Sequence, residues 1–202
     1  MKKILFNILA AVAAFAFISC EKGDSQKDLG FPVIYIPQAT VTGLDNSYPV
    51  PAGPLDQLTT CNCKIEDGKL NVIVGVLRAG FIADKKAFSV NLGECPSEAE
   101  RKLAELTENG TPAMALPAGT YTIPSKIDVP SGENGATCYV SIDIASLASH
   151  KAEIAEGEGF KLLVLGLEIS NPTAYSLAET NTSVVMVIDP ASEYWGENPL
   201  IQ

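Results

Sequence analysis

The thiols of four cysteines outside the N-terminal segment are the side chains of this sequence that form covalent bonds most readily. They are Cys61, Cys63, Cys95 and Cys138. Because one residue separates Cys61 from Cys63, an easy bridge between these two is not expected, and one or both should instead reach Cys95 or Cys138. A loop of about thirty residues closed in this way would contribute roughly 3 kcal/mol in the chain-entropy model. Two alternatives stay open: buried free thiols, and a Cys-x-Cys zinc site whose spacing is not that of a ribbon or finger.

The single histidine, His150, is the natural candidate for a general base. A catalytic histidine needs a nucleophile and an orienting carboxylate beside it. The alternation around Ser141 and Asp143 places both on the outward face of a strand. We therefore expect a surface histidine and no enzyme activity. The chain has 24 acidic residues, so a pair of carboxylates arises by chance and does not by itself indicate a glycosidase.

Acidic residues are densest at Glu153, Glu156 and Glu158, where glycines are interspersed. Ca²⁺ takes oxygen ligands, but the spaced pattern of an EF-hand is absent. A solvated charged loop is expected, with a calcium site as the alternative, so we expect no metal or other cofactor. The formal net charge of −10 opposes contact with phosphate backbones, which argues against nucleic acid as a partner.

The tail at 191–202 contains the one tryptophan of the chain, Trp195, next to Tyr194. Aromatic rings offer flat amphipathic area on which the apolar face of a sugar can stack. These two residues are therefore candidate glycan contacts. The alternative that we favour is docking of Trp195, Leu200 and Ile201 on the domain, because a terminal segment stays ordered only when it is tied down. A third alternative is disorder or donation of the tail to a partner.

The N-terminus reads as a targeting segment. A short positive region at Lys2 and Lys3 precedes an apolar stretch over 4–18, which has signal-peptide length and is too short for an ordinary spanning helix. The segment Phe17-Ile18-Ser19-Cys20 is similar to a bacterial lipobox, although Phe17 and Ile18 are bulkier than the usual residues. We therefore predict a lipoprotein signal peptide at 1–19 and lipidation of Cys20. The alternatives are an ordinary cleaved signal peptide and a buried N-terminal helix.

The lipid would hold the mature chain on a membrane, since several acyl chains anchor a protein far better than one does. Residues 20–30 are polar and lack a periodic apolar pattern, which is typical of a flexible tether. We expect a lipid anchor in the outer membrane. Glu21 and Asp24, close after the lipidated cysteine, favour the cell surface over the periplasmic leaflet.

Residues 31–190 are predicted to form one domain of short strands separated by proline and glycine turns. This pattern indicates a mainly β fold, an immunoglobulin-like antiparallel β-sandwich. The expected strands are Val33–Ile36, Leu70–Leu77, Phe88–Leu92, Tyr121–Ile123, Lys126–Val129, Cys138–Ile144, Leu162–Ile169 and Val184–Ile188.

One helix is expected as an insertion at about 97–108. Ser97 and Glu100 have the spacing of a capping box, and Asn109-Gly110 is a suitable stop. Short helical turns are expected at 145–155. Residues 43–58, which contain three prolines and two glycines, should form a loop.

The order of turns and strands resembles a known family. The motifs are Val33-Ile-Tyr-Ile-Pro37, Leu116-Pro-Ala-Gly-Thr-Tyr121, Ile127-Asp-Val-Pro-Ser-Gly132, Val140-Ser-Ile-Asp143, Leu163-Val-Leu-Gly-Leu-Glu-Ile169, Tyr175-Ser-Leu177 and Val185-Met-Val-Ile-Asp189. Together they resemble the domain of unknown function found in many Bacteroidetes lipoproteins, at the N-terminus of certain glycan-processing surface proteins. The likeness covers about 31–189 and is weaker over 93–115.

The resemblance implies an immunoglobulin-like sandwich that usually accompanies a glycosidase or a carbohydrate-binding module. About a dozen residues follow the last expected strand, so no catalytic module is expected in this chain. We expect a non-catalytic cell-envelope protein that assists glycan capture or adhesion, with a membrane, a glycan or a surface protein as partner. The alternative is a fimbrial or assembly-type subunit that pairs by strand addition.

Overall fold

The computed structural model describes residues 31–43, 45–53, 61–80, 82, 84–157, 159–196 and 200–201. The expected signal peptide at 1–19, Cys20 and the tether at 20–30 lie outside these residues, as does Glu158. Among the described residues, no helix is both long and apolar enough to cross a bilayer.

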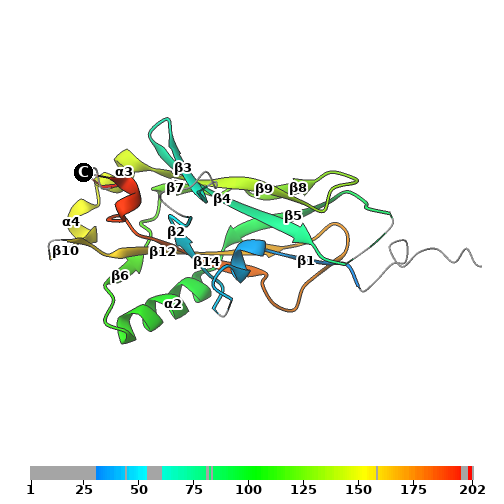
Figure 1. Cartoon of the computed structure of the whole chain (residues 1–202), viewed down its shortest axis with the longest axis horizontal. Helices are drawn as coiled ribbons and strands as arrows, with labels where there is room; N and C mark the ends of the chain where they lie inside the picture. Colours follow the sequence, from blue (N-terminus) through cyan, green and yellow to red (C-terminus); the bar gives the residue numbers. More distant parts are fainter. Residues whose placement is uncertain are drawn as a thin grey trace, which may run out of the picture.

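Two β-sheets face each other and enclose the core (Figure 1). We name each sheet after its central strand. The β4 sheet has the order β13 (Ser176–Leu177), β1 (Val33–Tyr35), β4 (Lys69–Arg78), β9 (Gly135–Asp143) and β7 (Tyr121–Thr122), and β3 (Cys63–Glu66) also pairs with β4. The β12 sheet has the order β2 (Ser47–Val50), β14 (Ser183–Ile188), β12 (Leu162–Ser170), β5 (Phe88–Glu94) and β8 (Lys126–Val129), and β6 (Ala113–Ala115) also pairs with β12.

The predicted mainly β sandwich is confirmed. Its inner faces are built by the alternation of apolar residues along the long strands. On β12 the inward side chains of Leu163, Leu165, Leu167 and Ile169 are all buried. On β9 the buried side chains are Val140 and Ile142. Three pairs are parallel, β1 with β13, β2 with β14 and β6 with β12, so the sheets are mixed rather than purely antiparallel.

The inserted helix is α2, Pro96–Glu108, and it covers the outer face of the β12 sheet (Figure 1). Its close approach is possible because Gly166 has no side chain. A Cβ there would collide with the Cys95 carbonyl oxygen and would lie 3.0 Å from the Ala99 nitrogen. β12 is therefore buried on both faces, which explains its nearly continuous apolar sequence.

The ends of α2 follow the expectation in part. Gly110 adopts a left-handed φ of 71° after the C-cap residue Asn109, as the predicted stop requires. The capping box is wrong: the N-cap is Cys95, and no side chain caps it. Pro96 occupies the first helical position, where its missing N–H costs nothing, so the helix starts before Ser97.

Other short elements complete the sandwich. The turns expected at 145–155 are two helices, α3 (Ile144–Ala148) and α4 (Lys151–Ile154), and Asp143 caps the first by accepting from the Ser146 N–H at 2.6 Å. The chain then forms a small hairpin of β10 (Ala155–Glu156) and β11 (Gly159–Phe160). Two 3₁₀ helices, η2 (Pro37–Thr40) and η3 (Glu193–Trp195), lie near the two ends of the domain sequence.

The prediction of a loop over 43–58 is wrong for Ser47–Val50, because these residues form the edge strand β2, which pairs with β14. Pro49 is tolerated because its backbone nitrogen points away from β14, so no hydrogen bond between the two strands needs an N–H at this position. The Pro49 carbonyl on that side accepts a hydrogen bond from Asn62 Nδ2 at 2.8 Å. Tyr48 and Val50 are buried in the core on either side of the exposed Pro49, and this alternation stabilises β2 as a strand despite its proline.

Candidate functional site

A polar pocket of about 380 Å³ lies where α2 meets η2 and the segment before β2. We call it the α2 pocket. It is lined by Ala39, Thr40, Gly43, Asp45, Asn46, Glu98, Arg101, Thr180 and Asn181. This volume falls in the range of small-molecule sites, roughly 300–1,000 Å³. The lining is dominated by carboxylate, guanidinium, amide and hydroxyl groups, so its ligand must be polar.

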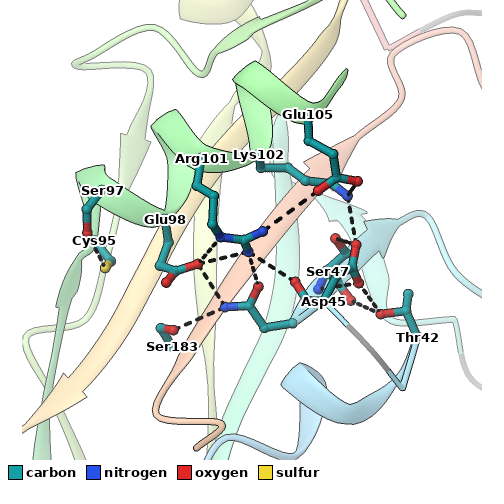
Figure 2. A network of polar contacts seen from close by, with 11 residues as sticks. Thr42, Asp45, Ser47, Cys95, Ser97, Glu98, Arg101, Lys102, Glu105 and Ser183 are labelled. Atoms are coloured by element: carbon teal, nitrogen blue, oxygen red, sulfur yellow. Dashed lines mark hydrogen bonds and ion pairs between the residues drawn. The ribbon is translucent and has the colours of Figure 1, made fainter. Parts of the chain in front are cut away.

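Asp45 fixes the floor of the pocket to the helix. Its carboxylate accepts from Lys102 Nζ at 2.8 Å, from Ser47 Oγ at 2.7 Å and from Thr42 Oγ1 at 2.6 Å (Figure 2). Partial burial acts to raise the pKa of Asp45, but these hydrogen bonds outweigh it and hold that pKa well below the usual range. Asp45 is therefore ionised at neutral pH.

Lys102 is the buried partner in this arrangement. Its side chain is 8% exposed and also donates to Glu105 Oε1 at 2.8 Å. Burial acts to lower the pKa of Lys102, yet the hydrogen bonds to Asp45 and Glu105 raise it overall. Because the ammonium has two carboxylate partners, the charge is stable inside the protein. The pair holds α2 and the segment before β2 in one fixed position.

Arg101, Asn46 and Glu98 form a polar cluster beside this ion pair. Figure 2 shows Arg101 and Glu98 on α2, next to Lys102. The Arg101 guanidinium donates to Asn46 Oδ1 at 2.7 Å, to the Asp45 carbonyl at 3.2 Å and to Glu98 Oε2 at 2.9 Å. The Asn46 amide nitrogen donates to Glu98 Oε2 at 3.2 Å and to Ser183 Oγ at 3.1 Å. These contacts lock the rotamers of three groups on the pocket wall, so a ligand meets a preorganised surface.

Two asparagines on the pocket wall have left-handed backbones. Asn46 has a φ of 49° and Asn181 a φ of 63°. Such conformations are uncommon outside glycine and concentrate at functional sites. The Asn181 carbonyl accepts from the Ile36 N–H at 2.8 Å, which ties this turn to the end of β1. Within the described part of the chain, the Thr180 hydroxyl and the Asn181 amide make no hydrogen bonds to protein, so both are available to a ligand.

The described lining of the α2 pocket offers carboxylate, guanidinium, amide and hydroxyl groups, all of which can bind a polar ligand. Its acids and bases largely neutralise one another. Amide, carboxylate and guanidinium groups can each serve two neighbouring hydroxyls, as donors, acceptors or both. A neutral polyol is the ligand class that fits this combination.

The residues singled out from the sequence lie elsewhere. His150 Nδ1 is 3.3 Å from Glu153 Oε2 on α4, and neither Ser141 nor Asp143 contacts it. Ser141 bonds to Asn71, and Asp143 caps α3. Among the described residues there is no group of three or more His, Cys, Asp or Glu side chains that could hold a metal.

The four cysteines are free thiols in this structure. Cys95 is the N-cap residue of α2 and directly follows β5, whereas Cys138 lies on β9 opposite Val74. Cys61 and Cys63 lie together at the start of β3, with their sulfurs 3.6 Å apart. The structure therefore brings together the one pair that the sequence spacing disfavoured, and it leaves Cys95 in the other sheet.

The C-terminal tail returns to the domain. Leu200 and Ile201 are buried, and Trp195 Nε1 donates to the Asp189 carbonyl at 2.9 Å. Tyr194 and Trp195 meet edge to face with ring centroids 4.9 Å apart, and both pack on the core while staying partly exposed. Neither lines the α2 pocket. Glycan contact at these two residues stays a prediction.

Sequence reasoning missed the α2 pocket because its wall comes from segments that no local pattern connects. Asp45 and Asn46 fell in the loop expected at 43–58, and Arg101 and Lys102 lie in the helix expected at about 97–108. One signal was available: Lys102 follows Glu98 by four positions and precedes Glu105 by three, which places the three residues on one helix face. The sequence pattern gives no indication that this helix face contacts Asp45.

Comparison with known proteins supports the fold. No family model and no curated protein matches the sequence. A Bacteroides ovatus protein of unknown function is 15% identical with a TM-score of 0.50, over 79% of this chain and 52% of that one. A multidomain protein including DUF1735, also from Bacteroides ovatus, is 10% identical with a TM-score of 0.46, over 78% and 43%.

An auxiliary nutrient binding protein from Bacteroides thetaiotaomicron is 14% identical with a TM-score of 0.42, over 73% of this chain and 44% of that one. The chain thus spans between 43% and 52% of the length of these three proteins. At such low identities the likeness concerns the fold alone. The Bacteroides ovatus protein with the TM-score of 0.50 therefore has a fold similar to that of this chain.

Proposed function

We propose that this protein is a lipid-anchored, non-catalytic protein of the outer membrane, displayed at the cell surface, that binds a glycan in the α2 pocket. The observation that carries the proposal is the preorganised wall of Asn46, Glu98 and Arg101, held by the Asp45–Lys102 pair. Cys20 and the segment before it support the lipid anchor. The family that the sequence resembles, whose members accompany glycan-processing modules, supports the ligand class.

The ligand test uses affinity electrophoresis of the purified chain through gels containing dextran, mannan, xylan or arabinogalactan. At least one of these neutral polysaccharides should retard the protein. Arg101→Ala and Glu98→Gln should each weaken that retardation about tenfold, equal to roughly 1.4 kcal/mol. Lys126→Ala, which removes an exposed cation of β8 paired with Asp128, is the matched control and should bind as the unsubstituted chain does.

Two outcomes would overturn parts of this proposal separately. If none of the polysaccharides retards the chain, the glycan ligand is wrong. If retardation occurs and Arg101→Ala leaves it unchanged, the ligand class stands but the α2 pocket is not the site. The Tyr194 and Trp195 pair would then be tested next with Trp195→Ala.

The anchor is tested by fractionation. Cys20→Ala should move the protein from the membrane to the soluble fraction, because the thioether-linked lipid requires the cysteine sulfur. Retention of this variant in membranes would contradict the anchor. Protease added to intact cells should digest the unsubstituted protein if it is displayed at the surface, and should spare it if it faces the periplasm.

The described sheet edges do not favour the alternative of strand addition. β2 carries Pro49, β8 carries the charged Lys126 and Asp128, and β13 is two residues long. Short, charged or proline-containing edges are the devices by which proteins avoid edge-to-edge pairing. Oligomers that grow with concentration in solution would instead support a structural subunit.

A further inference from the structure

Cys61 and Cys63 form an isolated thiol pair at the junction of β3, the end of β2 and the C-terminal tail. Their Sγ atoms are 3.6 Å apart. Cys63 is 5% exposed, whereas Cys61 is only partly buried and so meets solvent. The pair therefore combines one accessible sulfur with one protected sulfur in direct contact with it.

Asn62 sets this geometry. Its side-chain oxygen accepts from the Ala52 N–H at 2.7 Å, and its side-chain nitrogen donates to the Pro49 carbonyl at 2.8 Å. Its backbone N–H donates to the Ala52 carbonyl at 3.2 Å, and its carbonyl accepts from the Ile73 N–H at 3.0 Å. These four hydrogen bonds fix the bend between the two cysteines, so their sulfurs are held together before any reaction.

We propose that Cys61 and Cys63 are a modification site that takes up a low-molecular-weight disulfide and closes into a Cys61–Cys63 disulfide. The accessible Cys61 thiolate attacks one sulfur of the small disulfide RSSR, a Cys61–SR bond forms, and one RS⁻ leaves. Cys63 then loses its proton and attacks the Cys61 sulfur, the Cys61–SR bond breaks, and the second RS⁻ leaves. Two electrons pass from the protein thiols to RSSR, and the two thiol protons are taken up by the released thiolates.

The order of attack follows from burial. Burial, and after it the neighbouring Cys61, raise the pKa of the Cys63 thiol to about 12, so Cys63 is a poor first nucleophile toward a reagent in solution. Once Cys61 carries the mixed disulfide, the Cys63 sulfur is already beside its target and the second step is intramolecular. No other described cysteine competes, because Cys138 lies on the far side of β4 and Cys95 lies between β5 of the β12 sheet and α2.

The structure also supplies a reporter for the reaction. Tyr194 lies against Cys61, and that thiol together with burial raises the pKa of Tyr194 to about 12. Trp195, the single tryptophan, stacks edge to face on Tyr194. A disulfide formed here accepts electrons from an excited indole, so its formation should lower the fluorescence of Trp195.

The experiment exposes the reduced, purified chain to oxidised glutathione, then alkylates the remaining thiols and maps them by mass spectrometry. We expect Cys61 and Cys63 to lose one hydrogen each and to be joined, with Cys95 and Cys138 still alkylated and Trp195 fluorescence decreased. Cys63→Ser should stop at a stable glutathione adduct on Cys61. In Cys61→Ser, Cys63 should remain a free thiol that the alkylating reagent reaches only after the protein is unfolded. Cys138→Ser is the control and should react as the unsubstituted chain does.

Asn62→Ala tests the preorganisation while both cysteines stay in place, and it also removes the Oδ1 that accepts from the Cys61 thiol at 3.7 Å. It should slow closure of the disulfide and lengthen the lifetime of the adduct on Cys61. Thermal melts of each variant verify that it is folded before it is oxidised. The proposal is overturned if folded, unsubstituted protein keeps both thiols, if it accumulates the Cys61 adduct without closing, or if Cys61 joins Cys95 or Cys138 instead.

Discussion

Lys102 Nζ lies 2.8 Å from Asp45 Oδ2, and this ion pair joins helix α2 to the segment that leads into β2. The lysine is nearly buried, so loss of the aspartate leaves its charge with Glu105 as the one remaining carboxylate partner. We expect Asp45→Ala to lower the free energy of unfolding by about 2 kcal/mol, less than for a pair with no second partner. Asp128→Ala, which breaks the exposed pair with Lys126, should cost under about 1 kcal/mol. Urea denaturation measures both.

The same carboxylate predicts a dependence on pH. The folded-state pKa of Asp45 lies below its unfolded value, so the ionised group stabilises the fold at any pH above the unfolded pKa of about 3.9. As the pH falls below that value, the unfolded chain takes up a proton first and the stabilisation is progressively lost. The difference in unfolding free energy between the unsubstituted chain and Asp45→Ala should be constant from neutral pH down to about 5 and then shrink. A difference that grows on acidification would contradict this assignment.

Gly166 is required by the contact between α2 and β12. Gly166→Ala would place a methyl group against the Cys95 carbonyl and the Ala99 nitrogen, which are backbone atoms and cannot rotate away. We expect a loss of about 1–3 kcal/mol or more as the helix is displaced. Gly93→Ala is the matched control on β5, because a Cβ there meets nothing within 4 Å. Equal thermal midpoints for the two variants would contradict this prediction, because they would show that α2 can shift without loss of unfolding free energy.

Tyr175 is one of the hydrogen-bond partners of Arg78, a cation whose residue is 3% exposed. Its hydroxyl accepts from Arg78 Nη1 at 3.0 Å and from the Lys86 N–H at 2.9 Å, and its ring centroid is 5.0 Å from the Arg78 guanidinium carbon. Tyr175→Phe keeps the ring but leaves two donors without an acceptor, which should cost about 1–3 kcal/mol. Tyr35→Phe should be nearly neutral, since among the described residues the Tyr35 hydroxyl has no hydrogen bond. Guanidinium denaturation compares the pair.

Docking of the tail predicts a stability loss for Trp195→Ala. The indole packs on the core and donates to the Asp189 carbonyl, so its removal should cost on the order of 3 kcal/mol. Tyr139→Ala removes a partly exposed ring of β9 whose centroid lies 5.0 Å from Lys64 Nζ, and it should cost no more than about 1 kcal/mol. A tail that contributes nothing to the fold would give two identical melting curves.

Elements defined by local pattern could be predicted closely. The limits of β8 match the expectation, and α2 differs from it by one residue. β2 could not be predicted in this way, because its prolines indicate a loop unless the partner strand is known. β13 and β6 were missed for a related reason: each is two or three residues long and exists only through its parallel pairing with β1 or β12.

The candidate site was less accessible to sequence reasoning than the fold. The α2 pocket depends on the distance between Asp45 and Lys102 and on the left-handed backbones of Asn46 and Asn181. None of these is encoded in a local repeat or motif. The sequence did identify Cys61 and Cys63 as chemically notable, but their spacing argued against mutual contact until the bend at Asn62 was known.

The pairing of β2 with β14 also determines the order in which the domain can be completed. Ser47 lies near the beginning of the domain, yet its partner Val185 lies near the end. In the same way, β1 can pair with β13 only after most of the domain has been synthesised. Contacts so distant in sequence require closure of a very long loop, and such topologies fold slowly, on a scale of roughly milliseconds to seconds. During synthesis the edge of the β12 sheet therefore remains unformed until the last strand has emerged. A chain that emerges N-terminus first therefore cannot complete the β12 sheet until nearly all of its residues are available for folding.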